Sequence, residues 1–235
     1  MKISEIFVSI QGEGTRTGEL CAFFRLWGCS FGCYYCDTKY ANEGEYQEFS
    51  VYELLVKSKL LGVKLVQITG GEPLEQAETP QLAKKLIENG FTVLIETNGS
   101  KNIGLLPKKV IKIVDVKLPW VSKHGEKDHF CYENLQHLTA QDELKFVIDG
   151  EEGYNWAKTF IETHKIPCKI IFSPCETRVD RPLTTITPNT ACAASFAPQK
   201  QGLATHLAEW IIRDNLNIRF GMQLHKILWG DKRGV

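Results

Sequence analysis

The chain has 235 residues, with 28 Lys and Arg, 28 Asp and Glu, and a formal net charge of zero at pH 7. At roughly 150 residues per domain, this length favours one domain with insertions or two small domains. The content of 43% apolar and 24% charged residues is that of a globular protein and excludes a disordered or collagen-like chain. Without the cationic field that grips nucleic acid, we expect no direct nucleic-acid partner.

The distribution of apolar residues shows neither a signal peptide nor a membrane-spanning segment. Residues 1–5 contain no long apolar run, and no window approaches the roughly 18 apolar residues of a membrane span. We therefore expect a cytoplasmic protein without a membrane partner. In a reducing compartment, the eight cysteines favour metal or cofactor chemistry over disulfides.

Short apolar runs alternate with amphipathic stretches, which is typical of β/α units around a mostly parallel sheet. The predicted strands cover residues 22–27, 63–68, 91–96, 110–116, 143–148, 168–172 and 217–223. Ser50 and Glu53 form a capping box that predicts a helix start. Thr79 at the N-cap and Pro80 at the first helical position predict a second helix, which ends at residues 89–90. Two further amphipathic stretches cover residues 156–161 and 203–211.

Residues 173–201 interrupt this alternation with four prolines and little periodicity, so we expect an irregular insertion or lid there. The chain has neither an internal repeat nor a clean linker, which favours a single domain over residues 1–235. About seven strands, with fewer helices than a closed eight-fold barrel needs, predict an α/β fold. We expect an open, incomplete β/α barrel of the TIM type.

The strongest chemical signal is the triplet Cys29, Cys33 and Cys36, which directly follows the strand predicted at 22–27. Three thiolates on one compact loop can bind three irons of a [4Fe-4S] cubane and leave the fourth iron open to a substrate or cosubstrate. A structural zinc site is normally closed by four ligands. We therefore predict an iron–sulfur cluster, with a zinc site or unligated core cysteines as the alternatives.

The Cys-x-x-x-Cys-x-x-Cys spacing resembles the signature of radical S-adenosylmethionine (SAM) enzymes. Residues 70–73, Gly-Gly-Glu-Pro, follow the strand predicted at 63–68 and resemble the superfamily's element for the methionyl amine of SAM. Without the cysteines, these four residues would be a plain strand-to-helix turn. The resemblance implies a [4Fe-4S] cluster, SAM held partly by Gly71 and Glu72, and an electron donor such as flavodoxin or ferredoxin.

Within the superfamily, the chain is most similar to the 7-carboxy-7-deazaguanine synthases. The similarity rests on segments 10–14 (Ile-Gln-Gly-Glu-Gly), 24–26 (Phe-Arg-Leu), 36–38 (Cys-Asp-Thr) and 223–226 (Gln-Leu-His-Lys). It implies Mg2+-dependent ring contraction of 6-carboxy-5,6,7,8-tetrahydropterin with loss of ammonia, in queuosine or 7-deazapurine biosynthesis. It also implies a homodimer and an N-terminal substrate-binding segment.

This resemblance assigns roles to residues near the cysteines. Arg25 offers a planar cationic fork for the substrate carboxylate, and the Thr38 hydroxyl is a hard oxygen ligand for Mg2+. The alternatives are an ion pair of Arg25 with Glu19 or Glu13, and a turn role for Thr38. Together, the residues expected to contact the pterin are Ile10, Gln11, Gly12, Glu13, Arg25 and Thr69.

Other candidates stand at the carboxyl ends of predicted strands, where barrel active sites collect. The resemblance implies that Glu96 and Asn98 hold the ribose hydroxyls of SAM and that Lys117 pairs with its carboxylate. Asp115 and Ser173 depart from the residues usual at these positions. The full set expected around SAM is Gly71, Glu72, Glu96, Asn98, Asp115, Val116, Lys117 and Ser173.

The sequence assigns no catalytic acid or base; Glu13 and His225 are the candidates. A solvated turn carboxylate and a core-edge histidine are the alternatives for these two residues, and a tight turn is the alternative for Asn98-Gly99.

Three other functions compete with the synthase. A glycyl-radical-enzyme activase, or another radical SAM enzyme, shares the cysteine triplet but should lack segments 10–14 and 36–38. A tRNA-binding enzyme is disfavoured by the neutral charge. An electron-transfer module would normally have four cysteine ligands.

Overall fold

The computed structural model describes residues 1–123, 125, 129–175 and 202–235. The irregular insertion expected at 173–201 therefore lies outside the described residues from residue 176 onward. No helix of the described part is long and apolar enough to cross a membrane.

The described strands form one nine-stranded sheet in the order β3-β1-β2-β4-β5-β6-β7-β8-β9. From β2 onward, neighbouring strands run parallel, whereas β1 is antiparallel to both β2 and β3. The strands are β1 (Lys2–Ile10), β2 (Leu20–Leu26), β3 (Gln47–Glu48), β4 (Leu65–Gly70), β5 (Thr92–Thr97), β6 (Ile111–Val116), β7 (Glu143–Ile148), β8 (Lys169–Pro174) and β9 (Arg219–Phe220). No pairing among described residues joins β3 to β9, so the predicted open α/β barrel is confirmed.

All seven predicted strands are present, but the last is much shorter than the predicted range 217–223. Its final residues instead lead into the helix α6 (Leu224–Trp229). Strands β1 and β3 were not predicted. β1 buries only Ile3 and Ser9 and shows no period-two burial along its length, because it lies near the antiparallel edge of the sheet.

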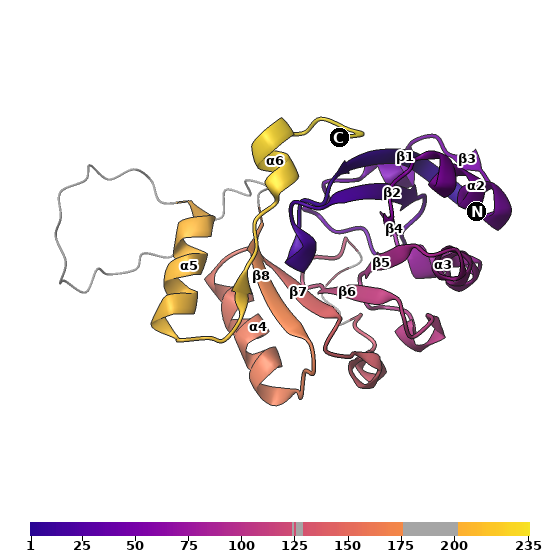
Figure 1. The fold of residues 1–235 in the computed structure, drawn as a ribbon. Helices are drawn as coiled ribbons and strands as arrows, with labels where there is room; N and C mark the ends of the chain where they lie inside the picture. The colour runs from indigo at the N-terminus through magenta and orange to yellow at the C-terminus, as the bar shows by residue number, and fades with distance from the viewer. Residues whose placement is uncertain (124, 126–128, 176–201) are drawn as a thin grey trace.

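The longer helices lie on the outer side of the curved sheet (Figure 1). They are α2 (Val51–Leu60), α3 (Thr79–Glu88), α4 (Glu151–Thr163) and α5 (Leu203–Arg213), alongside the short α1 (Tyr40–Glu43) and the 3-10 turns η1 (Gly14–Arg16), η2 (Pro73–Glu75), η3 (Ile103–Leu105) and η4 (Tyr132–His137).

The helix boundaries follow the sequence signals closely. The capping box of Ser50 and Glu53 starts α2 as predicted. In α3, however, Glu78 is the N-cap and Thr79 is the first helical residue. The buried Thr79 hydroxyl donates to the Pro73 carbonyl at 2.6 Å, so it ties the helix to the preceding turn instead of capping it.

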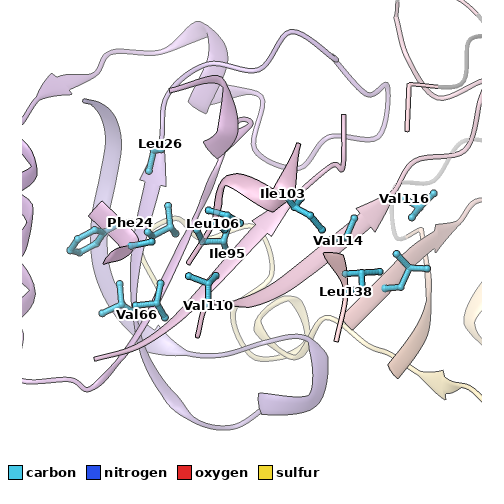
Figure 2. Close-up of a cluster of buried hydrophobic side chains, with 14 of the residues drawn as sticks. Phe24, Leu26, Val66, Ile95, Ile103, Leu106, Val110, Val114, Val116 and Leu138 are labelled. Atoms are coloured by element: carbon cyan, nitrogen blue, oxygen red, sulfur yellow. The ribbon is translucent and has the colours of Figure 1, made fainter. Parts of the chain in front are cut away.

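The two faces of the sheet differ in polarity. On the outer face, side chains such as Phe24, Val66, Ile95 and Val114 pack into the main hydrophobic core (Figure 2). The inner face carries Cys21, Phe23, Leu65, Leu94 and Ile113 near the amino ends of its strands. Side chains on one face of a strand recur every second residue. Two or four residues further along the strands, the same inner face carries Gln67, Thr69, Glu96, Asp115 and Lys145. The inner face therefore becomes polar towards the carboxyl ends of the strands.

Candidate functional site

A cavity of about 540 Å³ is lined by the polar inner face of the sheet, the cysteine loop and the C-terminal segment. This volume lies within the usual range for small-ligand sites, roughly 300–1,000 Å³. The structure brings almost all sequence-predicted site residues to it: Ile10, Gln11, Gly12, Glu13, Arg25, Cys29, Cys33, Cys36, Thr38, Thr69, Gly71, Glu96, Asn98, Asp115, Lys117, Ser173 and His225. Glu72 and Val116 are the predicted residues that do not line it.

Cys29, Cys33 and Cys36 are partly exposed, form no disulfide and line the cavity. Burial raises the pKa of the Cys29 thiol and raises that of Cys33 to about 11, although Lys117 opposes the shift at Cys33. The positive charge of a bound metal would favour the thiolate forms of Cys29 and Cys33.

The fit of a metal to these thiols depends on its geometry. Within the described ranges, no group of three His, Cys, Asp or Glu side chains converges on one point as a single-ion site would require. A cubane fits the donor set, because each of its thiolates binds a different iron.

The segment after β6, with Trp120 and Ser122, and Asp149 after β7 hold the cysteine loop in place. The Tyr34 hydroxyl donates to Asp149 Oδ2 at 2.6 Å, and Trp120 Nε1 donates to the same oxygen at 2.9 Å. The Ser122 hydroxyl donates to the Phe31 carbonyl at 3.0 Å. Phe31 and Tyr35 pack with Leu118 and Val121 in an apolar cluster, and Cys29 and Cys33 pack against it. An apolar cluster in this position limits the access of water to a metal bound by the cysteines.

The Gly-Gly-Glu-Pro turn packs its backbone directly against the start of the cysteine loop. Gly71 N donates to Leu26 O at 2.9 Å, and Glu72 N donates to Gly28 O at 2.8 Å. A Cβ on Gly71 would lie 1.8 Å from Gly28 O, so only glycine fits there. The turn and the cysteine loop therefore form one unit at the cavity wall.

Glu72 turns its side chain into this unit. Its carboxylate is 1% exposed and accepts from the Thr97 hydroxyl at 2.7 Å, from Asn98 N at 2.8 Å and from Leu74 N at 3.0 Å. Burial raises the pKa of Glu72, although these three hydrogen bonds oppose the shift. Glu72 thus fixes the ends of β4 and β5 relative to each other.

Asn98 lines the cavity and also forms the tight turn that the sequence left open as an alternative. Its Oδ1 accepts from Ser100 N at 2.9 Å, and Gly99 follows with a φ of +71°. Val116, by contrast, is fully buried in the outer core and does not line the cavity.

Segments 10–14 and 223–226, which are far apart in the sequence, meet at the cavity. Gln223 Nε2 donates to Glu13 Oε1 at 2.8 Å across 210 residues, and Leu224 N donates to Gly12 O at 2.9 Å. A Cβ on Gly12 would lie 2.2 Å from His225 Nδ1. The start of α6 is thereby joined to the loop after β1.

Arg25 lines the cavity with its side chain 16% exposed. Its Nε donates to Glu5 Oε1 at 2.7 Å, and the Tyr40 hydroxyl donates to the same oxygen at 2.6 Å. The partner is neither Glu19 nor Glu13, because Glu5 stands directly opposite Arg25 in the β1–β2 pair. No described residue accepts from the terminal nitrogens of Arg25, which leaves its fork for a ligand.

Lys145, which the sequence analysis did not predict, joins four predicted residues in a charged cluster that lines the cavity. Lys145 Nζ lies 2.6 Å from Glu13 Oε2, 2.6 Å from Glu96 Oε1 and 3.4 Å from Asp115 Oδ2. Asp115 Oδ2 also lies 2.7 Å from Lys117 Nζ. The sequence signal that could have identified Lys145 is its position as a charged residue within the mostly apolar strand β7.

Amides extend this cluster towards β1. Gln11 Nε2 donates to Gln67 Oε1, and Gln67 Nε2 donates to Glu96 Oε2 at 2.9 Å. Gln67 is 4% exposed and was also missed. Near the cysteines, Thr38 Oγ1 lies 3.6 Å from Cys36 Sγ.

Comparisons with known proteins agree with this geometry. The family model of the radical SAM superfamily matches residues 27–122. A 7-carboxy-7-deazaguanine synthase from Koribacter versatilis is 38% identical over 234 residues, which cover 97% of each chain. One from Chlorobaculum tepidum is 36% identical, over 100% of this chain and 97% of that protein.

Among solved structures, the crystal structure of QueE from Escherichia coli has a TM-score of 0.73 and 25% identity, and covers 95% of this chain and 94% of that one. The fold, the cysteine loop and the full-length similarity lead to one conclusion. The chain belongs to the 7-carboxy-7-deazaguanine synthase family of radical SAM lyases.

Proposed function

We propose that the protein converts 6-carboxy-5,6,7,8-tetrahydropterin to 7-carboxy-7-deazaguanine by ring contraction with loss of ammonia. The observation that carries this proposal is the convergence of segments 10–14 and 223–226, with Arg25, on the cavity that the cysteine loop lines. This convergence supports the binding of a small anionic heterocycle next to the proposed site of radical initiation. Such a product would give the protein a role in queuosine or 7-deazapurine biosynthesis.

The radical SAM family implies a [4Fe-4S] cluster and SAM. Cys29, Cys33 and Cys36 would hold the cluster. When bound, the cluster and SAM would supply the radical chemistry needed to remove a hydrogen atom from the substrate. The task of this chain is then to orient the reactants and to exclude water, which the aromatic cluster beside the cysteines supports.

For SAM, we propose contacts from the turn at Gly71, from Asn98, Lys117 and Ser173, and from the backbone at Val116. Glu72 would act through the turn whose shape it fixes, since its carboxylate is already used by three internal donors. Asp115 keeps one buried oxygen, Oδ1, without a hydrogen-bond partner among the described residues, which leaves an acceptor near Lys117.

For the substrate, we propose that Arg25 binds the carboxylate through its terminal nitrogens and that Gln11, Gly12, Glu13 and Thr69 contact the ring. Arg25 is prepared for this because Glu5 already holds its Nε. The hydrogen bond of Glu96 with Gln67 and its ion pair with Lys145 favour a position facing the substrate rather than the ribose of SAM.

We further propose Mg2+ near Thr38, where it would orient the substrate carboxylate. His225 and Glu13 are the candidates for proton transfer during ammonia loss. The proposal includes a single domain over residues 1–235, a homodimer, a flavodoxin or ferredoxin as electron donor, and a cytoplasmic location.

The test is an anaerobic assay of cluster-reconstituted protein with dithionite, SAM, Mg2+ and 6-carboxytetrahydropterin, read by mass spectrometry. We expect 7-carboxy-7-deazaguanine from the wild type and from Cys131→Ser, a cysteine outside the cavity, but none from Cys33→Ala. SAM cleavage without product would refute the substrate and favour another radical SAM enzyme. An intact reducible cluster without SAM cleavage would favour electron transfer. Omission of Mg2+ from the assay tests the proposed metal, and product formation should then fall.

A further inference from the structure

Lys145 is a buried cation with no role in the chemistry so far. It lies on β7 with its side chain 5% exposed, and it bridges Glu13 from the loop after β1 and Glu96 from β5 at 2.6 Å each. Glu13 and Glu96 keep 21% and 23% of their side chains exposed, and all three residues line the cavity. Lys145 is therefore the link between two carboxylates that face the ligand space.

Burying an ammonium group costs free energy that its ion pairs only partly return, so packing alone gives no reason for a lysine here. The chain offers a direct comparison in Lys112, which is equally buried and pairs with the buried Asp142 at 3.0 Å. Lys112 lies outside the cavity lining and joins parts of the scaffold. Lys145 differs from Lys112 because its partners reach the cavity.

Both carboxylates keep capacity to accept hydrogen bonds. Glu13 Oε1 accepts from Gln223 and Oε2 from Lys145, while Glu96 Oε1 accepts from Lys145 and Oε2 from Gln67 at 2.9 Å. A carboxylate oxygen has about two acceptor positions, so both oxygens of Glu13 and Oε1 of Glu96 retain room for a donor from a ligand. Glu96 Oε2 also accepts from the Thr69 hydroxyl at 3.5 Å, so its second position is already taken. The amino-pyrimidinone ring of the proposed substrate carries such N–H donors.

We propose that Lys145 is a positioning residue that holds Glu13 and Glu96 as carboxylate acceptors for the N–H donor edge of the substrate's pyrimidine ring. This inference rests on the proposed function and adds the determinant by which the site selects an amino-substituted ring. Without the ammonium group, two carboxylates would face each other beside Asp115, and their mutual repulsion would make them take up protons or move apart.

The charge states of the cluster support this role. Burial raises the pKa of Glu13, but the charge and hydrogen bond of Lys145, with the hydrogen bond of Gln223, outweigh it and lower the pKa to about 2. Burial raises the pKa of Glu96, and the charge of Lys145 opposes that shift. Loss of Lys145 would thus raise the pKa of both carboxylates and favour their protonated forms.

The experiment measures binding of 6-carboxypterin and of 6-carboxylumazine, in which a carbonyl oxygen replaces the 2-amino group, by ligand fluorescence. Neither ligand needs the reduced cluster. The wild type should prefer the pterin by about 10–100-fold, the usual discrimination for hydrogen bonds to a charged group. Lys145→Met should abolish most of this preference, and Lys145→Arg should restore part of it.

Lys112→Met is the matched control, since it also removes a buried ammonium from a carboxylate. It should lower stability and leave the ligand preference unchanged. Should Lys145→Met fail to fold, the double variant Lys145→Met with Glu13→Gln removes the charge pair together, and it too should lose the preference. An unchanged preference in these Lys145 variants would make the residue purely structural and overturn the inference.

The outcomes separate this inference from the proposed function. If the wild type forms product in the assay above while its Lys145 variants keep the preference for pterin, the function stands and the inference fails. If the wild type neither forms product nor binds 6-carboxypterin, both fail.

Discussion

Replacement of Glu72 by alanine should destabilise the protein although the residue lies beside a cavity. The substitution removes the acceptor for Thr97, Asn98 and Leu74, with hydrogen bonds of 2.7, 2.8 and 3.0 Å. Each donor left unpaired in a largely buried setting costs about 1–3 kcal/mol, and since two of the three are only partly buried, we expect a total of about 3–5 kcal/mol. Glu72→Gln keeps the shape and one acceptor oxygen and should cost about 1–2 kcal/mol.

The assay is urea unfolding of the apoprotein, followed by circular dichroism. Glu78→Ala is the control, because Glu78 is an exposed neighbour whose side chain makes no capping hydrogen bond, and its cost should stay within about 0.5 kcal/mol. A loss for Glu72→Ala no larger than that of the control would refute the reasoning.

The pH dependence gives a second check on the same residue. Burial raises the pKa of Glu72 in the folded state, so its contribution to stability is full below the unfolded pKa of about 4.5 and declines as the pH rises through the raised value. Glu72→Gln should lack this decline. Equal slopes for wild type and variant above pH 4.5 would contradict the shift.

Three further outcomes are expected. The lowered pKa of Glu13 gives stability that is lost as the pH falls from about 4.5 to about 2, so Glu13→Gln should flatten acid unfolding there; an unchanged slope would count against the Lys145 ion pair. Gly71→Ala, with its Cβ 1.8 Å from Gly28 O, should cost about 3 kcal/mol or more in thermal unfolding, whereas Gly62→Ala, whose Cβ meets nothing within 4 Å, should cost only about 1–2 kcal/mol from its φ of +70°. Asp149→Ala removes the acceptor that Tyr34 and Trp120 share and should reduce the iron retained after reconstitution; full retention would show that the cysteine loop holds its shape without these two hydrogen bonds.

Local patterns in the sequence were sufficient for much of the fold. The parallel strands from β2 to β8 can be recognised in the sequence as apolar runs because helices cover their outer face. The capping box at Ser50 fixes the start of α2 through contacts within one turn. Strands β1 and β3 and the extent of β9 were not predicted, since their burial depends on edge position and not on a local period.

The site divides in the same way. The spacing of Cys29, Cys33 and Cys36 predicts its chemistry because three ligands of one cluster must lie on one short loop. Resemblance to the synthase family then pointed to segments 10–14 and 223–226, and both line the cavity. The sequence by itself therefore determined the fold class, the cysteine loop and the family.

Only the tertiary structure decided how charges are paired along the cavity wall. Lys145 meets Glu13 across 132 residues and Glu96 across 49, and Arg25 meets Glu5 through a strand that the pattern did not reveal. A charged residue in a strand says that a partner is needed, but the partner is selected by strand order and by the curvature that brings distant segments together. Those contacts are long-range by nature, so no local period, cap or motif contains them.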